Sequence, residues 1–433
     1  MLSKAMRITA YAARARESAP ATFVRSFSAS PIPRVEEITR PAIDTPLSLW
    51  NFTEEETMLR ETVRRFAQDV IVPKVHDMDE KELMDPDIIK GLFDNGLMGI
   101  ETPADMSGSE CSFTSAIIAV EELARVDPSV AVMCDVHNTL VNTVLRLYGT
   151  DAIKEKWLPD LATSKVGSFC LSEPAAGSDA FALQTTAKKD GDHYILNGSK
   201  SWISNSAEAD TFLVFANVDP SKGYKGITCF VMSKDQGVQI AKKEKKLGIR
   251  ASSTCQLSFD DVRLHKDSIV GEVGKGYKIA IEILNEGRIG IAAQMVGLAQ
   301  GAFDHAVTYA YQRKQFGKLI GDNQKMGHDF ADAAIKIEAA RLLTYNAARL
   351  KEEGRLFTRE AAMAKRVDLR YYASVIAQEV TGAAIEWTGG VGFTRDLPLE
   401  KLWRDSKIGA IYEGTSNIQL ETIAKLIRKD YVS

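Results

Sequence analysis

The spacing of apolar positions changes twice along the chain, which predicts three consecutive regions of different secondary structure. From residue 53 to 163, apolar side chains such as Val63 and Phe66 recur at the three-to-four-residue spacing of helices with one buried face. Thr53 followed by Glu56 fits a helix N-cap, in which the glutamate returns to the backbone of the capping residue. The first region is therefore predicted to be helical.

The second region, from about Val166 to Val273, has short runs rich in β-branched and aromatic residues. These runs include Thr211–Phe215, Ile227–Met232 and Leu257–Phe259. Two dipeptides that favour tight turns, Asp190-Gly191 and Asn197-Gly198, flank another short apolar run. We expect a small antiparallel β domain here, similar to a barrel.

The third region, from about Tyr277 onward, is again helical in pattern. Ile279–Tyr311 is apolar almost throughout, which predicts a helix buried on most sides, and 329–351 and 360–386 predict two more long helices. The predicted fold class is therefore α+β, mainly α. We expect an N-terminal helical domain at 50–165, a middle antiparallel β-barrel-like domain at 166–276, and a C-terminal helical bundle at 277–433.

Composition excludes several classes of protein. The chain has 433 residues, 45% of them hydrophobic, and a net charge of −4. This charge is too balanced to indicate a nucleic-acid partner. No run of about 18 apolar residues occurs, so we expect no membrane insertion. The five cysteines are scattered, which indicates neither a disulfide framework nor a metal site.

Residues 1–45 differ from the rest of the chain. Between Met1 and Arg34 there are six basic residues and one acidic residue, with many Ala and Ser. This composition is typical of a mitochondrial transit peptide, and Arg25–Ser28 resembles a matrix-protease cleavage site. The alternative is a disordered N-terminal tail without a targeting role. We exclude this segment from the fold and expect the mature protein in the mitochondrial matrix.

Five motifs in order along the chain resemble those of the acyl-CoA dehydrogenase family. They are Phe169–Asp179, Trp202–Ser204, Arg313–Lys318, Gly389–Phe393 with Arg404–Ile408, and Ile411–Gln419. The resemblance runs from about Thr53 to the C-terminus. It implies the family's fold, FAD as cofactor, and an enzyme that introduces an α,β double bond into an acyl-CoA thioester.

The resemblance also implies which residues bind FAD. Trp202 would pack along the flavin ring, with Ser204 near its reactive nitrogen, and Arg313 would hold the pyrophosphate through its planar guanidinium. In the family, residues matching Glu386–Gly390 come from a neighbouring subunit. The implied cofactor-binding residues are Phe169, Cys170, Leu171, Ser172, Glu173, Pro174, Ala175, Ala176, Gly177, Ser178, Trp202, Ile203, Ser204, Arg313, Gln324, Glu386, Trp387, Thr388, Gly389, Gly390, Thr415, Ser416 and Asn417.

By the same resemblance, Glu413 is the catalytic base that removes a proton from Cα. Burial beside an acyl chain should raise its pKa toward neutrality. Some members place the base before the arginine that matches Arg288, but here that position is Gly287. Glu286, one residue earlier, should point elsewhere on the helix. Without the family context, a glutamate before a glycine at a helix start is more often a simple cap.

Three segments, Leu284–Met295, Leu342–Leu350 and Gly248–Cys255, resemble the members of the family that act on short or branched acyl chains, so we expect a short or branched acyl chain. The expected substrate is 2-methylbutyryl-CoA, in isoleucine breakdown, with isobutyryl and straight short chains as alternatives. Expected partners are electron-transfer flavoprotein and three further copies in a homotetramer, a dimer of dimers. The implied substrate-binding residues are Ser178, Tyr224, Tyr277, Asn285, Glu286, Gly287, Arg288 and Gly414.

Two departures from the family pattern and two competing functions remain open. The loop at 105–110 lacks glycines that the family usually has, and Arg366–Arg370 is an insertion into a helix or a gene-model error. An acyl-CoA oxidase would transfer electrons to oxygen, but the chain ends in Tyr431-Val432-Ser433 rather than a peroxisomal signal. An inactive relative acting in assembly would have no need to keep Glu413.

Overall fold

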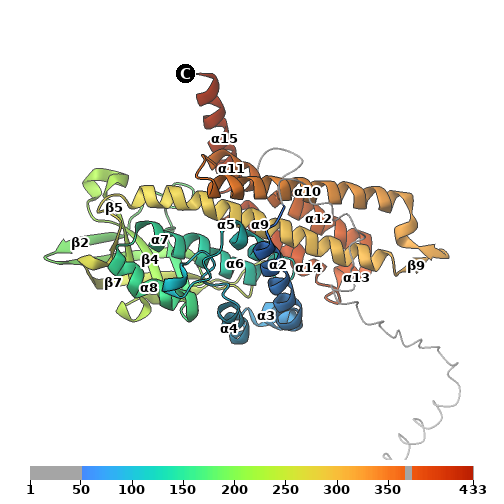
Figure 1. Ribbon diagram of the computed structural model, residues 1–433, viewed down its shortest axis with the longest axis horizontal. Helices are drawn as coiled ribbons and strands as arrows, with labels where there is room; N and C mark the ends of the chain where they lie inside the picture. The colour runs from blue at the N-terminus through green and yellow to red at the C-terminus, as the bar shows by residue number, and fades with distance from the viewer. Residues whose placement is uncertain (1–50, 366–372, 433) are drawn as a thin grey trace, which may run out of the picture. The chain divides into compact units, whose positions relative to one another are not determined.

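Residues 51–365 and 373–432 are described by the computed structural model, and they run as helices, then strands, then helices (Figure 1). The predicted transit peptide at 1–45 and the Arg366–Arg370 segment lie outside the described residues. The mainly helical α+β architecture predicted from the sequence is confirmed.

The N-terminal helices begin where the capping residues predict. Thr53 caps α2: its hydroxyl accepts from the Glu56 N–H at 3.1 Å, and Glu56 accepts from the Thr53 N–H at 2.9 Å. The capping box predicted from the sequence is thereby confirmed. The α-helices of this region are α2 (Glu54–Phe66), α3 (Val75–Lys81), α4 (Pro86–Asp94), α5 (Phe113–Ala124), α6 (Pro128–Asp135), α7 (Thr143–Tyr148) and α8 (Asp151–Thr163). Within the 105–110 loop, Ser107 and Glu110 adopt positive φ, where a glycine would be unstrained.

The middle region forms one eight-stranded sheet in the order β6-β7-β3-β2-β4-β5-β8, with β1 paired to β4. The strands are β1 (Gly167–Cys170), β2 (Thr186–Asp190), β3 (His193–Ser204), β4 (Thr211–Asn217), β5 (Ile227–Ser233), β6 (Gln239–Lys243), β7 (Thr254–His265) and β8 (Ile269–Val270). The predicted strands at 211, 227 and 257 are confirmed. The expectation of a purely antiparallel domain needs correction, because β1 runs parallel to β4.

One of the two predicted turns is a bulge. Asp190-Gly191 does connect β2 to β3, and Gly191 has φ +59°. Asn197-Gly198 instead lies inside β3, where the pairing with β7 shifts register between Leu196 and Gly198. A Cβ at Gly198 would lie 2.7 Å from the Thr185 Cα, so glycine allows a close approach of two backbones.

The C-terminal region is built around α9 (Gly276–Ala310), the long buried helix that the sequence predicts. It packs against α5 on one side and against α10, α11 and α12 on others. The remaining elements are α10 (Gln324–Glu352), α11 (Thr358–Lys365), α12 (Ala373–Thr388), α13 (Gly390–Phe393), α14 (Leu399–Ser406), α15 (Ser416–Tyr431) and the hairpin of β9 (Lys314–Gln315) and β10 (Lys318–Leu319). Of the helix predicted at 360–386, the described parts belong to α11 and α12. None of the described helices combines the length and apolarity needed to cross a membrane.

Candidate active site

Glu413 lies in a tight turn between the 3-10 turn Lys407–Ala410 and α15. Glu413 has φ +51° and Gly414 has φ +80°, so the chain reverses sharply there. The residue is only half-buried as a whole, yet its Oε2 is fully buried and has no hydrogen-bond partner among the described residues. A buried, unpartnered carboxylate oxygen is costly for stability, which is typical of a group kept for chemistry.

The Glu413 carboxylate faces α9 at Gly287. A Cβ at Gly287 would lie 2.9 Å from Glu413 Oε2 and 3.0 Å from Leu140 Cδ2. Any side chain at Gly287 would therefore compete with the carboxylate for the same space. The chain has room for one carboxyl group at this point, and that group is Glu413.

Burial raises the pKa of Glu413 to about 7, and the positive charges of Lys365 and Arg288 limit the rise. Lys365 Nζ donates to the Gly414 carbonyl at 2.6 Å, and Arg288 Nη1 donates to Asn285 Oδ1 at 2.7 Å. A carboxylate with this pKa is ionised in part at neutral pH and is basic enough to remove a weakly acidic proton.

Glu286 points away from this carboxylate, as expected from its helix position. Its Oε2 lies 3.3 Å from Lys351 Nζ on α10, and Glu101 is a near neighbour. Burial raises the pKa of Glu286 to about 7, while Lys351 opposes the rise and Glu101 adds to it. Glu286 is thus part of a separate buried cluster.

The sequence reasoning missed a second buried carboxyl, Asp135, at the end of α6. Its Oδ1 accepts from Thr139 Oγ1 at 3.0 Å and lies 1.9 Å from where a Cβ at Gly290 would be. Gly290 is one turn along α9 from Gly287, so Asp135 and Glu413 pack on the same helix face. Burial and the charge of Glu413 raise the pKa of Asp135 well above its ordinary value. The only sequence signal was an acidic residue within an apolar stretch.

Two glutamines that the sequence analysis did not single out hold the Glu413 turn. Gln419 Nε2 donates to the carbonyls of Glu413 and Gly414, each at 3.1 Å. Tyr412 donates its hydroxyl to Gln294 Oε1, and Gln294 Nε2 donates to the Pro128 carbonyl at 2.7 Å. The turn is therefore anchored to both α15 and α9.

The loop after β1 divides into buried and exposed parts. Phe169, Cys170, Leu171 and Ala176 are buried, whereas Pro174, Ala175, Gly177 and Ser178 are exposed and Ser172 lies between. Glu173 pairs with buried Lys200 at 2.7 Å and accepts from the Gln184 N–H at 2.6 Å. The Glu173 side chain thus makes contacts within the protein, so any contact of Glu173 with a cofactor would be made by its backbone.

Trp202 stands out on β3 because its ring is exposed and its backbone is strained. It has φ +65° and 62% exposure, at a register shift between Lys200 and Ile203. Positive φ in a bulky residue is rare and concentrates at functional sites. Ile203 is buried, and the Ser204 carbonyl accepts from Ser168 Oγ at 2.7 Å. The residues after Trp202 are thus held within the protein, while the indole is exposed.

A separate cleft of about 470 Å³ collects the candidate phosphate-binding residues. Its lining includes Arg313 and 386–391, but no residue of β1 or β3 within the described chain. Gly389 has φ +62°, and a Cβ at Gly389 or Gly390 would meet nothing within 4 Å. This end of α9 is about 35 Å from Gly287, at 1.5 Å per helical residue. Gln324 is exposed and does not line the cleft.

The remaining substrate candidates lie in two groups. Tyr224 and Tyr277 contact each other edge to face, with ring centroids 4.9 Å apart. Ser178 instead lines a groove of about 400 Å³ together with residues of α15, including Ile418 and Lys425. Thr415, Ser416 and Asn417 form the start of α15 beside the Glu413 turn.

Comparison with known proteins accounts for this arrangement. Three family models match: the acyl-CoA dehydrogenase N-terminal domain at residues 53–165, the middle domain at 168–262 and the C-terminal domain at 274–427. The short/branched chain specific acyl-CoA dehydrogenase of Rattus norvegicus mitochondria is 56% identical over 384 residues, 88% of each chain.

Two solved structures are similar over most of this chain. Butyryl-CoA dehydrogenase from Megasphaera elsdenii has a TM-score of 0.84 and 40% identity, covering 87% of this chain and 99% of that one. An acyl-CoA dehydrogenase complexed with FAD from Bacillus anthracis has a TM-score of 0.81 and 30% identity, covering 88% and 68%. The chain belongs to the acyl-CoA dehydrogenase family.

Proposed function

We propose that this protein oxidises short, branched acyl-CoA thioesters with FAD, and that 2-methylbutyryl-CoA, giving tiglyl-CoA, is its substrate. The observation that carries the proposal is the buried, unpartnered Glu413 carboxylate, whose pKa is raised to about 7. The similarity to the rat short/branched chain specific enzyme supports the choice of acyl group. Isobutyryl-CoA and straight short chains are the alternatives.

The residues present fit FAD. Trp202 offers an exposed ring on β3, and Arg313 with the open glycines at 389 and 390 offers a site for phosphates. Bound FAD would supply the acceptor for a hydride from Cβ. The solved Bacillus anthracis relative carries FAD, which supports this cofactor.

The chain's own part in the reaction is to bind, orient and take the α-proton. Glu413 Oε2 would receive the proton as charge moves onto the thioester oxygen. The Glu413 N–H donates to no other group in the described chain and is free to hydrogen-bond that oxygen. Exclusion of water around the buried carboxylate strengthens both interactions.

Replacing the base tests the proposal. Glu413→Gln keeps size and removes basicity, so flavin reduction by substrate should fall by the ~10²–10⁴ typical of a lost general base. Glu286→Gln is the matched control, because Glu286 is also buried with a pKa raised to about 7 but lies against Lys351. It should keep proton abstraction. If stopped-flow reduction of Glu413→Gln is near the wild-type rate, the assignment is wrong.

A substrate panel decides the acyl group. A kcat/KM for octanoyl-CoA or isovaleryl-CoA well above that for 2-methylbutyryl-CoA would refute the proposed substrate. We further propose domains at 50–165, 166–276 and 277–433, and the three family matches at 53–165, 168–262 and 274–427 support a division into three.

We propose a homotetramer, a dimer of dimers, in which FAD spans two copies. In one chain Trp202 and the Arg313 cleft do not share a cavity, so a cofactor that uses both would need a second subunit. Phe316, at the tip of the β9–β10 hairpin and next to the cleft residue Gln315, is fully exposed and would be covered by the second copy in this assembly. We place the mature protein in the mitochondrial matrix, which the mitochondrial relative and the composition of residues 1–45 support. The proposed electron acceptor is electron-transfer flavoprotein.

A further inference from the structure

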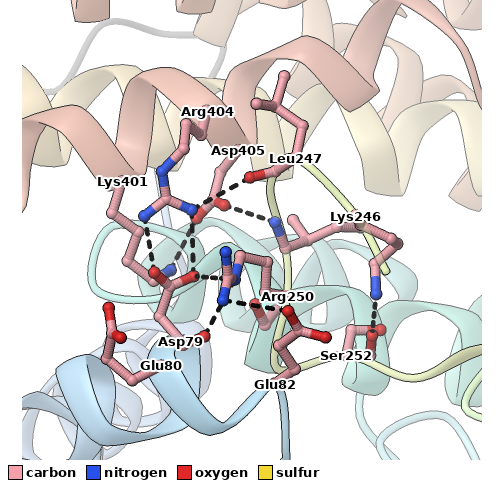
Figure 2. A network of polar contacts seen from close by, with 12 residues as sticks. Asp79, Glu80, Glu82, Lys246, Leu247, Arg250, Ser252, Lys401, Arg404 and Asp405 are labelled. Atoms are coloured by element: carbon pink, nitrogen blue, oxygen red, sulfur yellow. Dashed lines mark hydrogen bonds and ion pairs between the residues drawn. The ribbon is translucent and has the colours of Figure 1, made fainter. Parts of the chain in front are cut away.

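An ionic network centred on α14 joins three segments that are far apart in the sequence (Figure 2). Arg404 on α14 binds Asp79 on α3, with Nη2 to Oδ2 at 2.6 Å, and donates to the Leu247 carbonyl at 3.1 Å. Leu247 lies in the loop between β6 and β7. We call Asp79, Asp127, Lys401, Arg404 and Asp405 the α14 network.

The centre of the network is buried. Lys401 Nζ lies 2.7 Å from Asp405 Oδ2 and 3.1 Å from Asp127 Oδ1, and all three side chains are at most 5% exposed. The other oxygen of Asp405 accepts from the Ile249 N–H. Buried ion pairs add little net stability compared with apolar packing, so their use here points to a need for a specific geometry.

The loop that Asp405 holds is strained. Ile249 has φ +43°, which a β-branched residue adopts only when its surroundings force it. Gly248 lies so close to α14 that a Cβ would be 2.4 Å from the Arg404 carbonyl oxygen. Arg250 is fixed from the other side, with Nε donating to the Asp79 carbonyl at 3.0 Å.

The strained loop continues directly into contacts with the end of β3. The Ser253 carbonyl accepts from the Asn205 N–H and its hydroxyl accepts from the Ala207 N–H, both at 3.2 Å. Thr254 pairs with Ser204 in the sheet. In the other direction, α14 leads through one 3-10 turn to Glu413. The Asp405 carboxylate thus connects the segment that leads from α14 to Glu413 with β3, the strand that bears Trp202.

We propose that Asp405, with Lys401, is a positioning residue that sets the distance between the Glu413 segment and the strand carrying Trp202 and Ser204. The inference rests on the proposed function, in which the α-proton leaves toward Glu413 and the hydride leaves toward the flavin-facing strand. Reacting atoms must lie about 3–3.5 Å apart, and a 1 Å error can cost on the order of 10²-fold in rate.

The test is Asp405→Asn in the full-length FAD-loaded protein. The amide keeps the size and can still accept from Ile249, but it removes one of the two carboxylate charges that hold Lys401, leaving only Asp127. We expect kcat to fall at least tenfold, with FAD content unchanged and KM within about threefold. The kinetic isotope effect for substrate deuterated at Cβ should rise, because hydride transfer becomes limiting. Asp94→Asn, in the exposed Lys90–Asp94 pair of α4, is the matched control and should behave as wild type.

A purely structural role would lower the thermal midpoint but leave kcat per bound flavin and the isotope effect unchanged, and that result overturns the proposal. If Asp405→Asn does not accumulate as folded protein, Ile249→Gly removes the backbone strain and the buried side chain of the same loop while leaving every charge paired. It should also slow flavin reduction, and wild-type rates in this variant would overturn the proposal. Failure of the proposed function would differ: the wild type itself would lack flavin or react with no acyl-CoA.

Discussion

At the scale of single residues, the site is defined by which carboxyl groups are buried and what faces them. Glu413 and Glu286 each have a buried carboxyl oxygen, and both have a pKa raised to about 7. Their neighbours differ: Lys351 pairs with Glu286, whereas Oε2 of Glu413 is unpartnered and faces the bare backbone of Gly287. Of these two carboxyl groups, only that of Glu413 is free to act on a ligand. Their pKa values are alike and would not distinguish them.

The pH dependence of flavin reduction should report Glu413. The base acts only when deprotonated, so kcat/KM should be low at acid pH, rise through about pH 7 and then level off. The measurement is kcat/KM at closely spaced pH values, in wild type and in Glu286→Gln. The rise should persist in Glu286→Gln, since that variant lacks the other carboxyl that titrates near 7. A midpoint near the ordinary value of 4.5, or loss of the rise in Glu286→Gln, would contradict the assignment.

At the scale of elements, α9 organises the molecule because glycines let other elements approach it closely. A Cβ at Gly297 would lie 2.1 Å from the Glu121 carbonyl oxygen on α5, and one at Gly301 would lie 2.1 Å from the Arg125 carbonyl oxygen. The same helix presents Gly287 to Glu413. One helix thus carries both the close contact with α5 and the position that faces the base.

Gly297→Ala should destabilise the protein, because the added methyl meets backbone that cannot move without separating two helices. We expect a loss of about 1–3 kcal/mol, as for other overpacked cores, seen as a lower thermal midpoint. Gly327→Ala, on α10, is the control, since its Cβ would meet nothing within 4 Å. That change should stabilise by roughly 0.5–1 kcal/mol, because alanine favours helix over glycine. Equal effects of the two substitutions would rule out this role for Gly297.

At the scale of the whole molecule, the two halves of the proposed cofactor site belong to different ends of α9. In Figure 1, β9 and α13 lie at the end of α9 and α10 away from the sheet. The Arg313 cleft is therefore remote from the sheet within one chain. If two copies shared each FAD, the Trp202 strand of one copy and the Arg313 cleft of the other would together form a complete site. Cofactor binding would then depend on assembly.

Arg313→Ala should lower FAD content and assembly together, because bound FAD would bridge two copies. Sedimentation with flavin absorbance should show wild type as a tetramer with one FAD per chain, and the variant as smaller species with less flavin. Arg263→Ala, which breaks an exposed pair with Asp190 on the sheet, is the control and should change neither. A wild-type monomer that retains one FAD per chain would refute shared binding.

Much of the fold was predictable because its signals are local. The helical spacing of apolar residues, the Thr53 capping box and the Asp190-Gly191 turn each depend on residues a few positions apart. The strands at 211, 227 and 257 were correct for the same reason. Asn197-Gly198 was predicted as a turn because the dipeptide favours one, but Thr185 and β7 lie against it in the sheet and make it a bulge.

The sequence by itself determined the family and the order of helices, strands and helices. It also identified the candidate base, because the glutamate at 413 and the glycine at 287 can each be read from a single position in a motif. Only the tertiary structure decided what surrounds that base. Asp135 lies beside Glu413, Glu173 pairs with Lys200, and Arg404 reaches Asp79 across 325 positions of sequence. No local pattern encodes such contacts, because burial and pairing of charges depend on which distant segments the packed core brings together.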